Sequence, residues 1–72
     1  MNNKTTKNLQ LGRTIFKFRK EKGLSQNQLA EMLDISREHL AKIETAKRCV
    51  SLGLLFDISE VLGVPVKDFF DF

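Results

Sequence analysis

The sequence predicts an all-α domain of five short helices. Apolar residues recur at helical spacing in successive segments, serine or glycine residues stand at the ends of these segments, and the connections between them are short. A chain of 72 residues is long enough for one domain. We therefore expect a single small core.

The first helix is expected from Leu9 to about Lys22, at the start of a domain that spans residues 9–72. Residues 1–8 are polar and lack periodicity, which predicts a flexible N-terminal tail. Gly23 follows a lysine-rich last turn and ends the helix. The residues expected to face inward, at positions i, i+4 and i+7, are Leu11, Ile15 and Phe18.

Two further helix starts lie eleven residues apart, at Ser25 and Ser36. Each serine is a good N-cap, because its hydroxyl can accept a hydrogen bond from a free amide of the first turn. We expect helices over about 26–33 and 37–45, with only residues 33–35 left to turn the chain. Helices joined this tightly cross at a steep angle, which is helix-turn-helix geometry. The inward-facing residues are Leu29, Ala30, Leu33, Ile35, Leu40 and Ile43.

The C-terminal third predicts two more helices. Ser51 caps a helix over about 52–62, which Gly63 ends. Pro65 suits the first turn of a last short helix, about 65–70, because the first turn needs no amide donor there. The expected buried stripe of the longer helix consists of Leu52, Leu55, Ile58 and Leu62.

Charge is distributed unevenly along the chain, although the formal net charge is only +3. Residues 1–22 hold seven Lys or Arg and one Glu, whereas residues 51–72 hold one Lys and four acidic residues. A basic front and an acidic, apolar back indicate that one end faces a polyanion and the other faces protein.

The composition excludes several classes of function. One His and one Cys cannot form a zinc site of three or four nitrogen or sulfur ligands. A glycine-rich phosphate loop and a Ser/His/Asp set are both absent from the sequence, so we expect no metal, no cofactor and no enzymatic activity. The single Cys49 excludes an intrachain disulfide, and neither a membrane span nor a signal peptide is recognisable, which together predict a cytoplasmic protein.

The outward face of the helix expected over 37–45 carries residue types that contact nucleic acid, namely Arg37, Glu38, His39 and Lys42. Arg37 is the first candidate for a bidentate contact to guanine, and Glu38 can accept from a cytosine amino group. Glu38 can instead form a local ion pair with Lys42, four residues further along. The face therefore carries side chains able to read base edges or phosphates, with the role of Glu38 left open.

A series of short motifs occurs in order along residues 9–70. They are Leu11-Gly12, Arg19, Gly23-Leu24-Ser25-Gln26, Leu29-Ala30, Ile35-Ser36-Arg37, Ile43-Glu44, Lys47-Arg48, Ser51-Leu52 and Leu62-Gly63-Val64-Pro65. In these the sequence resembles the Cro/CI-type (XRE) helix-turn-helix family of phage repressors and small bacterial regulators. The resemblance implies a lambda-repressor-like DNA-binding fold. It also implies sequence-specific binding to double-stranded DNA as a two-fold homodimer.

The resemblance further implies roles for individual positions. Gln26 matches the family glutamine that binds a DNA phosphate and braces the recognition helix. The residues implied to face base edges, or to lie beside those that do, are Arg37, Glu38, His39 and Lys42, and those implied to hold the DNA backbone are Lys47 and Arg48. Arg19 and Glu44 match a partly buried ion pair that joins the first helix to the recognition helix.

Several positions depart from the family pattern, and two of them concern the backbone conformation. Asp34 and Ala46 stand where glycine is common. A left-handed backbone costs about 1–2 kcal/mol for residues other than Gly. Ala46 therefore either carries strain or directs the following loop along another path.

Phenylalanines are concentrated at the C-terminal end, where we find Phe56, Phe69, Phe70 and Phe72. This is more aromatic surface than so small a core can easily bury, and exposed apolar patches usually mark partner surfaces. We expect an isologous dimer through the last helix and the tail, with Phe69, Phe70 and Phe72 at the interface.

These observations predict a transcriptional regulator, most simply a repressor that acts as a homodimer on an inverted repeat, although activation at some sites stays open. The alternative is an antitoxin or other protein-interaction module in which DNA binding is secondary. Its support is the acidic, phenylalanine-rich C-terminal third together with the surface-type apolar residues Phe16 and Leu54.

Overall fold

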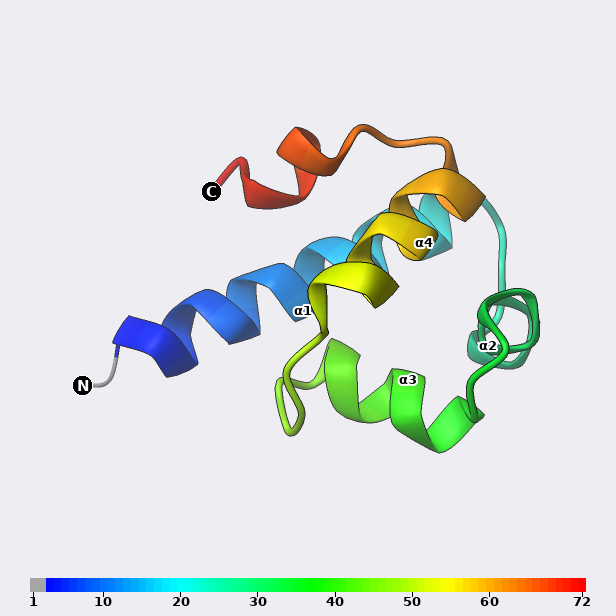
Figure 1. Ribbon diagram of the computed structural model, residues 1–72, viewed down its shortest axis with the longest axis horizontal. Coiled ribbons are helices and arrows are strands. Elements are labelled where there is room, and N and C mark those ends of the chain that lie inside the picture. The colour runs from blue at the N-terminus through cyan, green and yellow to red at the C-terminus, as the bar shows by residue number, and fades with distance from the viewer. Residues whose placement is uncertain (1–2) are drawn as a thin grey trace.

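The protein consists of four α-helices and one short 3-10 helix in the computed structural model, which describes residues 3–72 (Figure 1). The elements are α1 (Asn3–Glu21), α2 (Gln26–Leu33), α3 (Arg37–Glu44), α4 (Leu52–Leu62) and the 3-10 helix η1 (Val66–Phe70). These described residues contain no strand, so the all-α fold expected from the sequence is confirmed.

The N-terminal helix begins earlier than the sequence indicated. It was expected to follow a flexible tail of residues 1–8, but α1 already includes residues 3–8. These residues are polar and gave no apolar pattern, yet extending a helix that already exists adds one hydrogen bond for each residue ordered. The expected helix start at Leu9 is therefore wrong, and residues 1–2 lie outside the described part of the chain.

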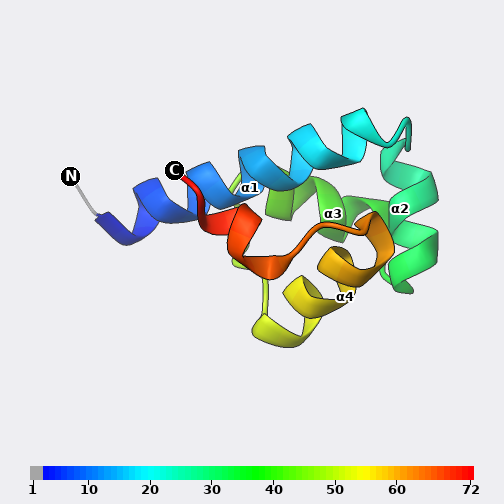
Figure 2. The ribbon, with the colours of Figure 1, turned by 90° about the horizontal axis from the view of Figure 1, so that it is seen from above.

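The other four elements lie around α1, the longest helix. Figures 1 and 2 show α1 along the long dimension of the molecule, with α4 and α3 beside it and η1 returning along it. α1 contacts α3, α4 and η1, while α2 bridges α3 and α4. The steep crossing of α2 and α3 gives the predicted helix-turn-helix geometry.

The core lies between these helices and is filled by aliphatic side chains and one phenylalanine. Phe69 from η1 is fully buried and packs edge-to-face on Phe18 of α1, with ring centroids 5.2 Å apart. The other large side chains that are fully buried are Ile15, Leu29, Leu40, Ile43, Ile58 and Leu62. Every one of them was expected to face inward from its helical spacing.

Two expectations for the C-terminal third are wrong. Leu52 was assigned to the buried stripe of α4 but is 65% exposed, because it occupies the first position of the helix, where packing from the other helices does not reach it. The last helix is a 3-10 helix, and Pro65 precedes it in an extended conformation. A segment of five residues is too short to gain much from α-helical bonding, which favours the tighter turn.

Candidate nucleic-acid interface

Each of the two helices of the helix-turn-helix unit begins at a serine cap. The Ser25 hydroxyl accepts from the Gln28 amide at 3.0 Å, and the Gln28 side chain accepts from the Ser25 amide at 2.8 Å, which completes a capping box. Ser36 accepts from the His39 amide at 3.0 Å and starts α3. These bonds define the first turns of both helices, where four of the candidate DNA-contacting residues lie, namely Gln26, Arg37, Glu38 and His39.

The outer face of α3 is open to solvent. Arg37, Glu38 and Lys42 are exposed and His39 is half-buried. Glu38 and Lys42 form an ion pair of 3.2 Å across one turn. Because both side chains are exposed, this pair contributes little stability and can separate when a ligand approaches.

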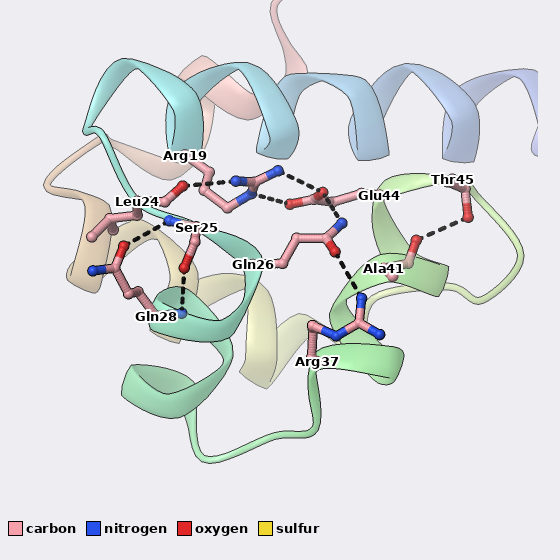
Figure 3. Close-up of polar contacts among 9 residues, drawn as sticks. All are labelled: Arg19, Leu24, Ser25, Gln26, Gln28, Arg37, Ala41, Glu44 and Thr45. Atoms are coloured by element: carbon pink, nitrogen blue, oxygen red, sulfur yellow. Dashed lines mark hydrogen bonds and ion pairs between the residues drawn. The ribbon is translucent and has the colours of Figure 1, made fainter.

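The opposite side of α3 is joined to α1 by a buried ion pair (Figure 3). Arg19 Nε donates to Glu44 Oε2 at 2.7 Å and Arg19 Nη2 donates to Glu44 Oε1 at 3.2 Å. Arg19 Nη1 also donates to the Leu24 carbonyl at 2.7 Å, and both charged residues are at least nine-tenths buried. Such a pair is costly to break from one side, by about 3–5 kcal/mol, since the remaining charge would stay buried.

Gln26, the first residue of α2, connects this ion pair to the outer face. Its Nε2 donates to Glu44 Oε1 at 2.9 Å, and its Oε1 accepts from Arg37 Nη1 at 3.4 Å. The side chains of Arg19, Glu44, Gln26 and Arg37 therefore form one continuous chain from α1 to the surface of α3, which we call the relay (Figure 3).

The loop after α3 is held by a left-handed alanine. Ala46 has φ = 62°, so of the two outcomes expected for this position it takes the strained one. The Ala46 amide donates to the Ile43 carbonyl at 3.1 Å and the Lys47 amide to the Lys42 carbonyl at 2.8 Å, the two bonds of a Schellman ending. This ending places the exposed side chains of Lys47 and Arg48 directly after α3. Asp34 is also left-handed, with φ = 58°.

Gly12 determines how closely α1 approaches the candidate recognition helix. A Cβ atom at this position would lie 2.5 Å from the Ile43 carbonyl oxygen and 2.8 Å from that of Glu44. Both are backbone atoms of α3 and cannot rotate away. The closeness of the two helices, which allows Arg19 to reach Glu44, therefore depends on the missing side chain.

The C-terminal phenylalanines divide into two groups. Phe69 is fully buried in the core, so its assignment to a dimer interface is wrong: the core accommodates one ring more than the sequence suggested. Phe70 and Phe72 are 51% and 53% exposed, with ring centroids 6.4 Å apart. These two rings are available to a partner.

The apolar residues that favoured a protein-interaction module have partners within the chain. Phe16 is 46% exposed, but its ring centroid lies 5.1 Å from Arg19 Cζ, so it covers the guanidinium. Leu54 is half-buried against the core. Neither side chain stands alone on the surface.

Over residues 3–72, no helix is long and apolar enough to cross a membrane. The same stretch holds no group of three or more His, Cys, Asp or Glu side chains able to bind a metal ion.

A family model described as helix-turn-helix matches residues 15–69, which is most of the chain. The chain belongs to the Cro/CI-type (XRE) helix-turn-helix family. This confirms the predicted family, and the comparisons do not favour the antitoxin alternative.

Relatives of this helix-turn-helix chain include control and regulatory proteins. It is 40% identical over 63 residues to the control protein C.MunI of a Mycoplasma species, covering 86% of this chain and 85% of that protein. It is 39% identical over 61 residues to an uncharacterised HTH-type transcriptional regulator, RC0668, of Rickettsia conorii, covering 85% of this chain and 49% of that one. The chain thus spans about half the length of the Rickettsia regulators it matches.

The same fold occurs in solved structures of this family. The restriction-modification controller protein C.AhdI from Aeromonas hydrophila superposes with a TM-score of 0.82 at 27% identity, covering 86% of this chain and 94% of that chain. The fold of the helix-turn-helix unit is thereby confirmed independently of sequence motifs.

Sequence reasoning identified the helix-turn-helix residues singly but missed the way in which they are joined. The bond from Gln26 to Glu44 links two residues that were assigned separate roles. The only sequence signal for this bond is that both residues belong to the family motif. Gly12 was noted as part of a motif, without the close approach that explains it.

Proposed function

We propose that this protein binds a specific sequence of double-stranded DNA as a homodimer and represses transcription, working in the cytoplasm. The observation that carries the proposal is the exposed Arg37 guanidinium in the first turn of α3, on a helix whose opposite side is anchored to α1 and α2. A helix held in this way can enter the major groove with its N-terminal residues against base edges.

In this proposal the first turn of α3 reads sequence. Arg37 donates two hydrogen bonds to guanine O6 and N7, the commonest specific contact in the major groove. Glu38 leaves its weak pair with Lys42 to accept from a cytosine amino group, and Lys42 is then free to reach a base or a phosphate. His39 lies beside them, half-buried, within reach of the groove edge.

A second set of residues holds the phosphate backbone. Gln26 uses one Nε2 proton on Glu44 and keeps the other for a phosphate oxygen, at the N-terminus of α2, where the helix dipole attracts anions. Lys47 and Arg48 extend from the loop after α3 and contribute the sequence-independent, salt-dependent part of binding.

Dimerisation occurs through the exposed rings of Phe70 and Phe72, packed against the same surface of a second copy. A two-fold dimer places two copies of α3 in successive major grooves, with half-sites about 34 Å apart. A protein bound over both grooves occludes polymerase when the site overlaps a promoter, which makes repression the simplest outcome.

Selection of bound duplexes from a random library tests the proposal, followed by fluorescence anisotropy on the enriched duplex at two salt concentrations. We expect an enriched inverted repeat that is bound about 10³-fold or more tightly than random DNA. Weak binding to every duplex that fades steeply with salt would show only the phosphate contribution and would contradict sequence recognition.

A further inference from the structure

The buried ion pair has an unusual third partner. Glu44 Oε1 accepts both from Arg19 Nη2 and from Gln26 Nε2, at 3.2 and 2.9 Å. Gln26 belongs to a different helix from either charged residue, and its amide oxygen faces Arg37 (Figure 3). The relay therefore connects three helices and ends at an exposed guanidinium.

The charged groups on either side of Gln26, Glu44 and Arg37, determine which way its amide points. A glutamine amide has an NH₂ donor on one side and a carbonyl oxygen on the other, while a carboxylate only accepts and a guanidinium only donates. Turned by half a rotation, the amide would present its oxygen to Glu44 and its NH₂ to Arg37, and both bonds would be lost. Only one orientation satisfies both neighbours.

The anchor of the relay is itself rigid. Arg19 is held by Glu44 and by the Leu24 carbonyl, and the Phe16 ring covers the guanidinium 5.1 Å away. Burial strengthens these hydrogen bonds, because the surroundings screen charge less than water does. Glu44 therefore presents its Oε1 to Gln26 from a fixed position.

We propose that Glu44, held by Arg19, is a positioning residue for base recognition: it fixes the Gln26 amide, whose oxygen then holds the Arg37 guanidinium in one pose toward DNA. Arg37 is long and exposed, and an unrestrained side chain loses rotamer freedom when it binds a base. A guanidinium that is already oriented loses less of this freedom. The inference rests on the base-reading role proposed for Arg37. It adds that the buried Glu44 carboxylate orients the Arg37 guanidinium for that role.

The decisive variant removes the anchor while preserving the fold. Arg19→Met and Glu44→Met are introduced together, because apolar residues are tolerated in place of a buried ion pair whereas one unpaired charge is not. Dissociation constants are measured for two duplexes. One is the duplex selected by the unaltered protein. The other differs from it only at the base pair that the Arg37→Ala variant no longer distinguishes. Urea unfolding first verifies that each variant is folded.

We expect the ratio of these two dissociation constants to fall about tenfold in the double variant, a change within the range of one bidentate base contact. Affinity for random duplex should fall much less than the ratio does, since the phosphate contacts of Lys47 and Arg48 are untouched and only the one from Gln26 is loosened. Gln26→Met should produce the same fall and add nothing to the double variant, because residues acting through one chain are not additive. In an Arg37→Ala background the double substitution should have no further effect on the ratio.

Two further variants keep the test decisive. Ile58→Val lowers stability in the core of α4, away from the relay, and should leave the ratio unchanged. Arg19→Gln combined with Glu44→Gln serves if the Met pair unfolds: no buried charge is left unpaired, and the amide at position 44 keeps one acceptor oxygen but no longer selects one orientation of the Gln26 amide, so the ratio should again fall. In DNA-free protein, the Gln26 side-chain NH₂ protons should exchange faster with water once Glu44 is replaced.

A folded anchor variant that retains full discrimination would overturn the inference and leave the pair a purely structural link. An equal loss of affinity for both duplexes would overturn it too. If the unaltered protein selects no duplex, the proposed function fails and the inference fails with it. If it selects one and Arg37→Ala relaxes a single base pair, only the role of Glu44 is in question.

Discussion

At the scale of single residues, Arg37 and Lys47 are expected to contact DNA in different ways. Arg37 lies in the first turn of α3 and is held by Gln26, whereas Lys47 extends from the loop that follows α3. A planar guanidinium can recognise guanine through two bonds, while an ammonium acts on phosphate as a point charge. Removal of each side chain should therefore affect DNA binding in a different way.

Arg37→Ala should weaken binding to the selected duplex by about 1–3 kcal/mol and relax preference at one base pair. Lys47→Ala, the matched control, should weaken binding to all duplexes alike and reduce the salt slope by about one. Anisotropy on selected and random duplexes at several salt concentrations measures both. Equal losses on the two duplexes for Arg37→Ala would refute its role in reading bases.

Ala46 stores strain that a glycine would release. With φ = 62° it takes the left-handed position of a Schellman ending, so Ala46→Gly should raise the free energy of unfolding by about 1 kcal/mol. Ala41→Gly, the same change inside α3, should lower it by about 1 kcal/mol. Urea unfolding curves distinguish the two, and a loss of stability in both variants would contradict the left-handed assignment.

At the scale of elements, the contact between α1 and α3 organises the candidate interface. It depends on Gly12, whose absent side chain lets the two backbones meet, and on the pairing of Arg19 with Glu44. Sequence periodicity identified the inward faces of both helices. Periodicity gives no information about the distance between two helices, because that distance is decided by the smallest residue at the crossing.

Gly12→Ala should lower the free energy of unfolding by about 1–3 kcal/mol, because the added Cβ meets two backbone carbonyls that cannot rotate away. Gly53→Ala is the matched control, since a Cβ there meets nothing within 4 Å and lies in a helix, where alanine is preferred. It should leave stability unchanged or raise it by up to about 1 kcal/mol. Thermal or urea unfolding measures both, and equal effects would contradict the close crossing.

At the scale of the whole molecule, the candidate DNA-contacting helix and the exposed phenylalanines lie on different elements, with α3 on one side of α1 and the C-terminus on the other (Figure 1). The relay and the loop after α3 form a surface suited to a polyanion, whereas Phe70 and Phe72 leave apolar surface at the C-terminal end. This separation lets the proposed dimer form without covering the proposed DNA-binding face.

Phe70→Ala combined with Phe72→Ala should shift the protein from dimer to monomer in sedimentation equilibrium, because the two exposed rings supply the apolar surface of the interface. Met32→Ala removes a similarly exposed apolar side chain from α2 and should leave the dimer intact. A stable dimer in the phenylalanine variant would refute this interface.

Local patterns in the sequence determined the helices and the family. The serines at 25 and 36, the apolar spacing of Ile15, Leu29 and Ile58, and the ordered family motifs were sufficient for this, because caps and periodicity act over a few residues. The same local view misjudged residues 3–8, where a polar segment continues an existing helix without any apolar signal.

Only the tertiary structure decided which side chains meet. It buried Phe69 against Phe18, exposed Leu52, placed Ala46 in a left-handed turn and joined Gln26 to Glu44 across two helices. The Phe18–Phe69 and Gln26–Glu44 contacts each join segments far apart in the chain. Burial and pairing are shared properties of several elements, so a pattern within one element cannot specify them.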